Sequence, residues 1–202
     1  MCGIAGFYHK EKNYEENELH YRSLLHAMHR ELWRRGPDDA GTCLTKHCGL
    51  SHSRLSIIDI AGGHQPMMRS AAGRTCMIVY NGELYNGNEL RGLLTERGWT
   101  FDTSCDTEVI LLGFMEFGPE FVKRLNGIFA FAVYDSREET LHLFRDPMGV
   151  KPLFYTERNG ELIFASELKG ILAHPAVEAE IDRQGLNEIF GIGPARTPGC
   201  GV

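Results

Sequence analysis

The second residue of the chain is a cysteine that can act as both nucleophile and base. The chain begins Met1-Cys2-Gly3, and removal of an initiator methionine requires a small second residue, so we expect Cys2 to become the N-terminus. A free thiol, with a pKa of about 8.5, and an α-amine, with a pKa of about 7.7 to 8.0, can then exchange a proton within one residue. This arrangement needs no separate catalytic histidine. The alternative is that Cys2 is simply a small residue after the initiator.

An asparagine-glycine pair follows a predicted apolar strand and can stabilise a developing negative charge. The pair, Asn81-Gly82, comes directly after the apolar residues 76–79. The side-chain amide of Asn81 and the unobstructed backbone N–H of Gly82 are suitable donors to the oxyanion of a tetrahedral acyl-transfer intermediate. The alternative is a tight turn, which Asn-Gly commonly forms after a strand.

Three charged residues can form a clamp for an amino acid. Arg54 lies among apolar residues of a predicted strand, and arginine holds a carboxylate through two parallel hydrogen bonds better than lysine does. Asp106, just before a predicted helix, and Glu83 can receive an ammonium group. The alternatives are a surface arginine on an alternating strand for Arg54 and a helix N-cap for Asp106.

The other histidines and cysteines predict no further site. His52 lies between two serines, but adjacent residues of a strand face opposite sides, which argues against a Ser/His pair. Cys43, His47, Cys48 and His52 have a spacing that matches no closed zinc site, so we predict no metal. The six cysteines form no CxxC pair and no disulfide framework, which favours reduced thiols.

The residue patterns around these side chains predict an α+β fold. Helical periodicity or capping signals predict helices over residues 19–35, 88–97, 107–117 and 166–172. Apolar runs bounded by turn signals predict strands over residues 3–8, 49–58, 75–80, 128–134, 141–145, 152–156 and 162–165. Short turns at 136–139 and 158–161 predict hairpins, so much of the sheet should be antiparallel.

Length and composition favour one globular domain and exclude several classes of partner. The chain has 202 residues, of which 43% are apolar and 24% charged, with a net charge of -6. An acidic balance disfavours binding to nucleic acid. No run approaches the roughly 18 apolar residues of a membrane span, and the N-terminus has no apolar secretory segment, so we expect a cytoplasmic protein with no membrane partner. The tail after Ile181 is predicted to be a connector.

Six sequence blocks occur in order over nearly the whole chain. The blocks are CGIAG at 2–6, RGPD at 35–38, RLSIID at 54–59, YNGELYN at 80–86, DTE at 106–108 and RDPMGVKPL at 145–153. Together they resemble the glutaminase domain of the glutamine-hydrolysing asparagine synthetases, which are class II amidotransferases of the N-terminal-nucleophile hydrolase type. Other class II groups typically carry a histidine before their Asn-Gly pair. This chain has Tyr80 at that position, which argues against those groups. The chain departs from the family at Arg34, where histidine is more frequent, and at Cys105, where serine is frequent.

The resemblance implies a catalytic role for three of these residues. Cys2 attacks the side-chain amide of L-glutamine, while Asn81 and Gly82 stabilise the oxyanion. A γ-glutamyl thioester forms on Cys2, ammonia leaves, and water then releases glutamate. The fold that the resemblance implies is a four-layer αββα sandwich of two antiparallel sheets.

The resemblance also implies how glutamine is held. Arg54 binds the α-carboxylate, and Glu83 together with Asp106 binds the α-ammonium. The backbone of four consecutive residues lines the same pocket. These residues are Leu55, Ser56, Ile57 and Ile58.

The same resemblance implies a partner outside this sequence. Residues 1–190 form the glutaminase domain, and residues 191–202 begin a connector to a synthetase domain in cis. That second domain would use ATP and magnesium to activate the ammonia acceptor, which is aspartate or another carboxylate. The sequence contains neither the Ser-Gly-Gly-x-Asp-Ser pyrophosphate loop of such a domain nor a Walker A loop, so we expect no cofactor in this chain. A homodimer is compatible with the resemblance. A second functional class stays open, namely a non-catalytic binding or assembly domain of an amidotransferase acting on another acceptor.

Overall fold

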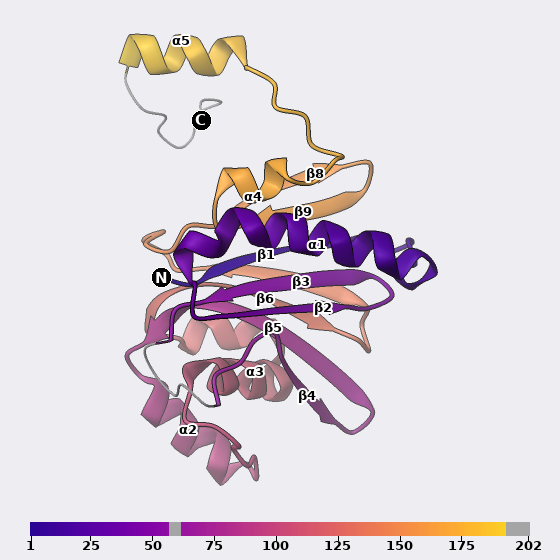
Figure 1. Ribbon diagram of the computed structural model, residues 1–202. Coiled ribbons are helices and arrows are strands. Elements are labelled where there is room, and N and C mark those ends of the chain that lie inside the picture. Colours follow the sequence, from indigo (N-terminus) through magenta and orange to yellow (C-terminus); the bar gives the residue numbers. More distant parts are fainter. Residues whose placement is uncertain (57–61, 193–202) are drawn as a thin grey trace.

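Two antiparallel β-sheets lie face to face at the centre of the computed structural model, which describes residues 1–56 and 62–192 (Figure 1). The first sheet has the strand order β2-β3-β1-β9-β8 and the second the order β4-β5-β6-β7. The strands of the first sheet are β1 (Gly3–Tyr8), β2 (Asp39–Leu44), β3 (Cys48–Arg54), β8 (Phe154–Arg158) and β9 (Glu161–Ala165). Those of the second are β4 (Met67–Ala71), β5 (Arg74–Leu84), β6 (Gly127–Asp135) and β7 (Thr140–Arg145). The helices are α1 (Glu18–Leu32), α2 (Gly87–Glu96), α3 (Asp106–Phe117), α4 (Leu168–Leu172) and α5 (Arg183–Ile192).

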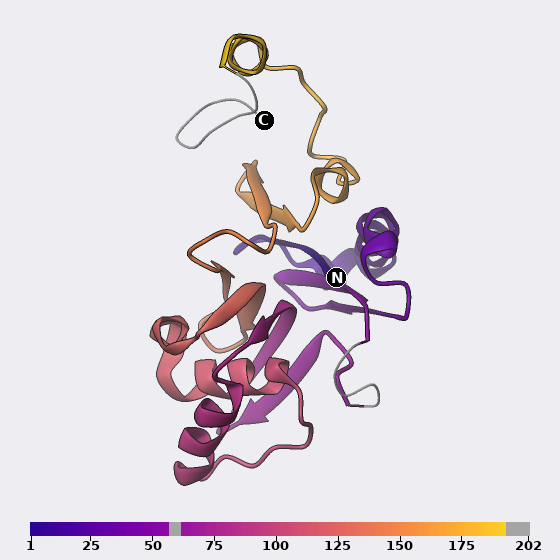
Figure 2. The same ribbon diagram turned by 90° about the vertical axis from the view of Figure 1, so that its left-hand side faces the viewer.

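Helices cover the outer face of each sheet and complete four layers. α1 and α4 pack on the first sheet, and α2 and α3 lie on the far side of the second (Figures 1 and 2). The predicted apolar stripe of α1 is buried, with Leu25 and Met28 fully enclosed against Phe7 of β1. Because side chains alternate along a strand, every second residue of each sheet points to the other face, toward the second sheet. Ile4 of β1 and Val79 of β5 belong to the core between the two sheets. The four-layer α+β sandwich is thereby confirmed.

Both predicted hairpins are present. Residues 136–139 join β6 to β7, which pair antiparallel. Between β8 and β9 the two loop residues are Asn159 and Gly160, with φ values of 54° and 76°. Two successive positive φ angles define the turn that matches the twist of a two-residue hairpin, which is why Asn-Gly suits this position.

The turn considered for the other Asn-Gly pair does not form. Asn81 and Gly82 lie inside β5, which continues to Leu84 instead of ending at Tyr80. The neighbouring strand β6 pairs with this segment throughout, with Gly82 opposite Phe129 and Leu84 opposite Gly127. Ladder hydrogen bonds from β6 therefore override the local turn preference of Asn-Gly.

The strand predicted over residues 49–58 is shorter than expected. β3 ends at Arg54, and Leu55 and Ser56 have no regular structure. At the end of β3 the backbone N–H of Asp38 donates to the Arg54 carbonyl at 3.0 Å, and the Asp38 carboxylate accepts from the Ser56 N–H at 2.8 Å. Ser56 is thus held by a side chain and not by a neighbouring strand. Ile57 and Ile58 lie outside the described residues.

The sequence prediction missed two β-strands and one α-helix among the described residues. Neither β2 nor β4 contains a fully buried residue: β2 is half-buried almost throughout, and β4 alternates between half-buried and exposed residues. Neither therefore presents the apolar run by which the other strands were predicted. The tail after Ile181, predicted as a connector, contains the helix α5, and the predicted domain boundary at residue 190 lies inside it. The Asp182 carboxylate accepts hydrogen bonds from the N–H groups of Gln184 and Gly185 at 3.2 and 2.7 Å, which is an N-cap signal that the prediction overlooked.

Candidate active site

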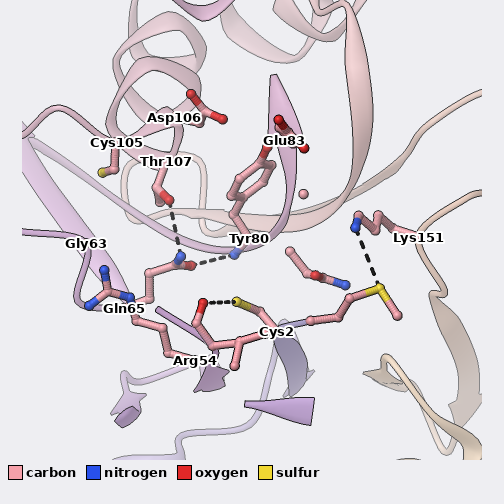
Figure 3. Close-up of a pocket in the computed structure, with 14 residues that line it drawn as sticks. Cys2, Arg54, Gly63, Gln65, Tyr80, Glu83, Cys105, Asp106, Thr107 and Lys151 are labelled. Atoms are coloured by element: carbon pink, nitrogen blue, oxygen red, sulfur yellow. Dashed lines mark hydrogen bonds between the residues drawn. The ribbon is translucent and has the colours of Figure 1, made fainter. Parts of the chain in front are cut away.

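A pocket of about 190 Å³ opens where β1, β3, β5 and α3 begin or end on one side of the sandwich (Figure 3). It brings together seven of the ten residues predicted for the site. These are Cys2, Arg54, Leu55, Asn81, Gly82, Glu83 and Asp106. Ser56 is not part of its lining, and Ile57 and Ile58 lie outside the described residues. The sheet topology therefore brings predicted site residues as far apart in the sequence as Cys2 and Asp106 to one pocket.

Cys2 is held at the pocket by its backbone. It immediately precedes β1, and its carbonyl accepts a hydrogen bond from Nε of Arg35 at 2.8 Å. Arg35 is fixed in turn by an ion pair of 2.9 Å between its Nη1 and Oε1 of Glu167. The Cys2 Sγ lies 3.7 Å from the carbonyl oxygen of Leu55. The nucleophile candidate is thus a half-buried thiol on a fixed main chain.

Asn81 carries a buried donor that the protein itself does not use. Its side chain is 2% exposed, and its Nδ2 has no hydrogen-bond partner among the residues that the structure describes. Leaving a buried amide donor unpaired costs about 1–3 kcal/mol, so such an atom in a pocket wall is a candidate to donate to a ligand. A preorganised donor that is free to bind a ligand atom is what an oxyanion site requires.

Gly82 can have no side chain at this position. A Cβ built on it would lie 2.5 Å from the Ile128 carbonyl oxygen and 2.8 Å from the ring of Tyr80. Both distances are shorter than any normal contact with a carbon atom. The absence of a side chain at Gly82 therefore allows β5 to pack closely against β6 and the Tyr80 ring, and it leaves the backbone of Gly82 uncovered by a Cβ at the pocket.

Arg54 lies at the end of β3, with its side chain in the pocket and only 6% of the residue exposed. The surface arginine considered as its alternative is therefore excluded. A bridge between Pro37 and Arg54 fixes the backbone at this point. The guanidinium faces the pocket from the side opposite Lys151 (Figure 3).

The two carboxylates approach from the other wall, beside the ring of Tyr80 (Figure 3). Asp106 is the first residue of α3 and the N-cap of that helix is Cys105, so the capping role considered as the alternative for Asp106 is wrong. Its carboxylate instead accepts from the Leu84 N–H at 2.9 Å. Burial, together with the charge of Glu83, raises the pKa of Asp106 above its usual value, against the Leu84 hydrogen bond and Arg91, which lower it.

His52 lies outside the pocket and has a packing role. Its Nε2 is 3.1 Å from the Tyr80 carbonyl oxygen, and burial lowers the pKa of His52 to about 4, so the ring is neutral at pH 7. Ser53 faces the other side of the sheet and bonds His29 at 3.0 Å. The two neighbours therefore do not form a catalytic pair, as strand alternation predicted.

The sequence prediction missed several lining residues. They are Met1, Gly63, Gln65, Tyr80, Cys105, Thr107 and Lys151. Lys151 was detectable, since it belongs to the block at 145–153. There the Asp146 carboxylate accepts the N–H groups of Val150 and Lys151 at 2.9 and 3.0 Å, which places Lys151 at the pocket. The Lys151 Nζ is 3.7 Å from the Met1 Sδ.

The described part of the chain shows neither a metal-binding cluster nor a membrane-spanning helix. Within residues 1–56 and 62–192, no three histidine, cysteine, aspartate or glutamate side chains are arranged to hold a metal ion. No helix there has the length and apolar character needed to cross a bilayer.

Comparison with known proteins gives one consistent family. A family model described as a glutamine amidotransferase domain matches residues 1–201. The asparagine synthetase (glutamine-hydrolysing) 3 of Bacillus subtilis is 45% identical over 202 residues, which is all of this chain and 32% of that protein. The asparagine synthetase B of Escherichia coli is 36% identical over 173 residues, or 85% of this chain and 30% of that protein. The chain thus spans about a third of the length of these relatives.

Solved structures support the fold. The glutamine phosphoribosylpyrophosphate amidotransferase of B. subtilis superposes with a TM-score of 0.62 over 84% of this chain and 42% of that one, at 22% identity. A structure described as the allosteric regulatory enzyme of purine biosynthesis gives a TM-score of 0.64 over 85% of this chain and 43% of that one. At this identity the likeness concerns the architecture alone.

Proposed function

The chain belongs to the glutamine amidotransferase domain family, as found in glutamine-hydrolysing asparagine synthetases, and on that premise we propose that it hydrolyses L-glutamine through a thioester on Cys2. The observation that carries the proposal is the buried, unpartnered Nδ2 of Asn81 in the same small pocket as the Cys2 thiol. A nucleophile and an oxyanion donor facing one cavity are the two parts that acyl transfer needs first.

The reaction proceeds in two halves with the acyl group on sulfur between them. The Cys2 sulfur attacks the amide carbon and forms the S–C bond, while the Asn81 Nδ2 and the Gly82 N–H stabilise the oxygen that becomes negative. The C–N bond then breaks and ammonia leaves with a proton. Water attacks the thioester, the C–S bond breaks, and glutamate and the free thiol are released.

The α-amine of Cys2 moves the protons in both halves. It takes the thiol proton during attack and gives a proton to the departing nitrogen, then assists the incoming water in the same way. That amine is joined to Met1 in the full sequence, so removal of Met1 comes first. Met1 is 59% exposed, which supports its accessibility to an aminopeptidase.

The charged residues of the pocket hold the amino-acid end of glutamine. Arg54 binds the α-carboxylate with two hydrogen bonds, and Asp106 together with Glu83 binds the α-ammonium. Leu55 lines the same pocket and contributes to enclosing the substrate, whereas the predicted contributions of Ser56, Ile57 and Ile58 stay predictions. The burial of Arg54 supports this role, because water does not compete strongly at a guanidinium that is 6% exposed.

Replacement of Arg54 by lysine is expected to raise KM for glutamine about tenfold with a smaller change in kcat. Lysine keeps the charge but offers a single ammonium in place of the planar fork. Steady-state glutamate release measures both constants. The matched control is Arg158→Lys on the exposed strand β8, which should behave as wild type. An unchanged KM in Arg54→Lys would remove Arg54 from glutamine binding.

We expect glutamine binding to weaken on acidification, and to do so at a higher pH than if Asp106 had the pKa of an ordinary aspartate. Asp106 must be ionised to attract an ammonium group, and its pKa is raised by burial and by Glu83. As pH falls through that raised pKa, Asp106 is protonated and KM increases. The check is KM as a function of pH, compared with Asp106→Asn, whose KM should be high throughout and lack this step. A flat wild-type profile down to acid unfolding would contradict the assignment.

We further propose that the ammonia serves an amidation in a larger protein. The relatives that this chain matches are about three times as long, which supports a synthetase domain in cis after residue 190. That domain would use ATP and magnesium, with aspartate as the acceptor and asparagine as the product. The cytoplasm is the compartment that suits such chemistry, and a homodimer is the assembly to test.

The experiment that tests the proposal combines intact mass with product analysis. Mass spectrometry selects preparations that lack Met1, and these should convert glutamine into glutamate and ammonia in equal amounts. A processed preparation that releases no glutamate, while calorimetry or dialysis shows that it binds glutamine, would support the non-catalytic binding domain instead.

A further inference from the structure

Gln65 has a buried side chain that the proposed mechanism does not use. It lines the pocket, yet only 6% of the residue is exposed. Its Oε1 accepts the backbone N–H of Tyr80 at 2.6 Å, and its Nε2 donates to Oγ1 of Thr107 at 3.2 Å. Both bonds are visible in Figure 3, which shows the amide between the two residues. Both ends of the amide are therefore committed to different elements.

The hydrogen bond from the Tyr80 N–H to the Gln65 side chain replaces a backbone hydrogen bond that the β4–β5 pairing does not provide. The β4–β5 ladder ends with Met67 opposite Ile78. Continuing that register would place residue 66, a proline without an N–H, opposite Val79 and Gln65 opposite Tyr80. The Gln65 side chain supplies the acceptor that a further strand residue would have offered to Tyr80. β5 is thereby held in place one residue before Asn81.

The backbone of Gln65 is itself fixed by close packing. A Cβ at Gly41 of β2 would lie 1.9 Å from the Gln65 carbonyl oxygen, so the two backbone segments are in direct contact. The first sheet therefore restricts the backbone of Gln65. Because this backbone is fixed, the side-chain amide can hold β5 and α3 at a constant separation.

The hydrogen bond from Gln65 to Thr107 completes the first of two hydrogen-bonded connections between β5 and the start of α3, which we call ties. Thr107 follows Asp106, whose carboxylate accepts from the Leu84 N–H at 2.9 Å. One tie thus joins Tyr80 to Thr107 through Gln65, and the other joins Leu84 to Asp106 directly. Between these two points lie the proposed oxyanion donors, Asn81 and Gly82, together with Glu83. A shift of α3 along β5 by one residue, about 3.3 Å, would break both ties.

We propose that Gln65 is a specificity-determining positioning residue, which fixes the separation between the Asn81-Gly82 donors and the Asp106 carboxylate and thereby selects the chain length of the amide substrate. The inference rests on the proposed function. Glutamine has two methylenes between its α-carbon and its amide, and asparagine has one. A rigid spacing rejects the shorter amide, because its two ends cannot reach both sets of groups together.

Competition by asparagine measures this selectivity with a single assay. Glutamate release gives KM for glutamine and Ki for L-asparagine as a competitor, and their ratio reports how strongly length is distinguished. Gln65→Leu removes both ties, and Thr107→Val removes one of them with almost no change in shape. We expect the ratio of Ki for asparagine to KM for glutamine to fall about tenfold in Gln65→Leu, in the range associated with one methylene, and to fall in the same direction in Thr107→Val.

Two further variants separate positioning from packing. Gln65→Glu keeps an acceptor for the Tyr80 N–H and a second oxygen for the Thr107 hydroxyl proton, so it should restore most of the wild-type ratio. Gln184→Leu on α5 makes the same kind of change far from the pocket and should leave the ratio intact. An unchanged ratio in both Gln65→Leu and Thr107→Val, with or without lower thermal stability, would overturn the inference alone. A wild type that releases no glutamate would overturn the proposed function and this inference with it.

Discussion

Cys2→Ala is expected to reduce glutamate release from glutamine by at least about 10⁴-fold, the scale seen when the nucleophile of a covalent mechanism is removed. The other thiol of the described pocket lining, Cys105, is buried and its Sγ lies 3.0 Å from Oγ1 of Thr103, so we do not expect it to replace Cys2. In the proposed reaction Asn81 and Gly82 stabilise charge, while Arg54, Glu83 and Asp106 hold the amino acid. Without the thiol no covalent acyl intermediate forms. Water must then attack the unactivated amide directly, and this single step has a much higher activation barrier.

Alanine is a suitable replacement because it separates chemistry from processing. It is as small as cysteine, so removal of Met1 continues and the α-amine remains free. Glutamine should still bind, since the clamp residues are untouched. The measurements are glutamate release and glutamine affinity by calorimetry on the same protein, after intact mass has shown that Met1 is gone.

The control for thiol loss is Cys43→Ala. Cys43 is also half-buried, but it lies on β2 outside the residues that line the pocket, and its Sγ contacts Met77 at 3.3 Å. Its loss should leave turnover at the wild-type level. Equal turnover in Cys2→Ala and wild type would rule out Cys2 as the nucleophile and with it the thioester.

Much of the frame that carries these residues could be predicted from local pattern. The apolar stripe of α1 and the Asn159-Gly160 hairpin each follow from a spacing rule that needs no distant contact. Pairing of Cys2 with Asn81 in one pocket was also anticipated, but from the resemblance of ordered blocks. Nothing in the local sequence indicates that β1 and β5 belong to facing sheets.

The rest depends on contacts between distant segments, which local propensity does not encode. Asn81-Gly82 has the composition of a turn and becomes strand because β6 supplies partners up to Leu84. Asp106 has the position of a cap and instead binds the Leu84 N–H, 22 residues earlier in the chain. Gln65 shows no motif at all, and its role emerges only when β5 and α3 are seen beside it. In each case tertiary hydrogen bonds decide what the residue does.

Asn81→Ala is expected to lower kcat for glutamine hydrolysis by about 10²–10³-fold, as for loss of one oxyanion donor. The fold should tolerate the change unusually well. The Nδ2 removed has no partner among the described residues, so the substitution discards a buried donor whose burial is itself unfavourable. Because the atoms lost line an open pocket, no closed cavity is left behind.

The two effects therefore run in opposite directions, and that contrast is the test. Turnover should collapse while the thermal midpoint of Asn81→Ala stays at or above that of wild type, and KM should change little because ground-state binding relies on Arg54 and Asp106. The matched control is Asn88→Ala on the exposed face of α2, which should alter neither quantity. Wild-type turnover in Asn81→Ala would remove it from the oxyanion site, and a lost turnover that merely accompanies unfolding would assign the residue to packing.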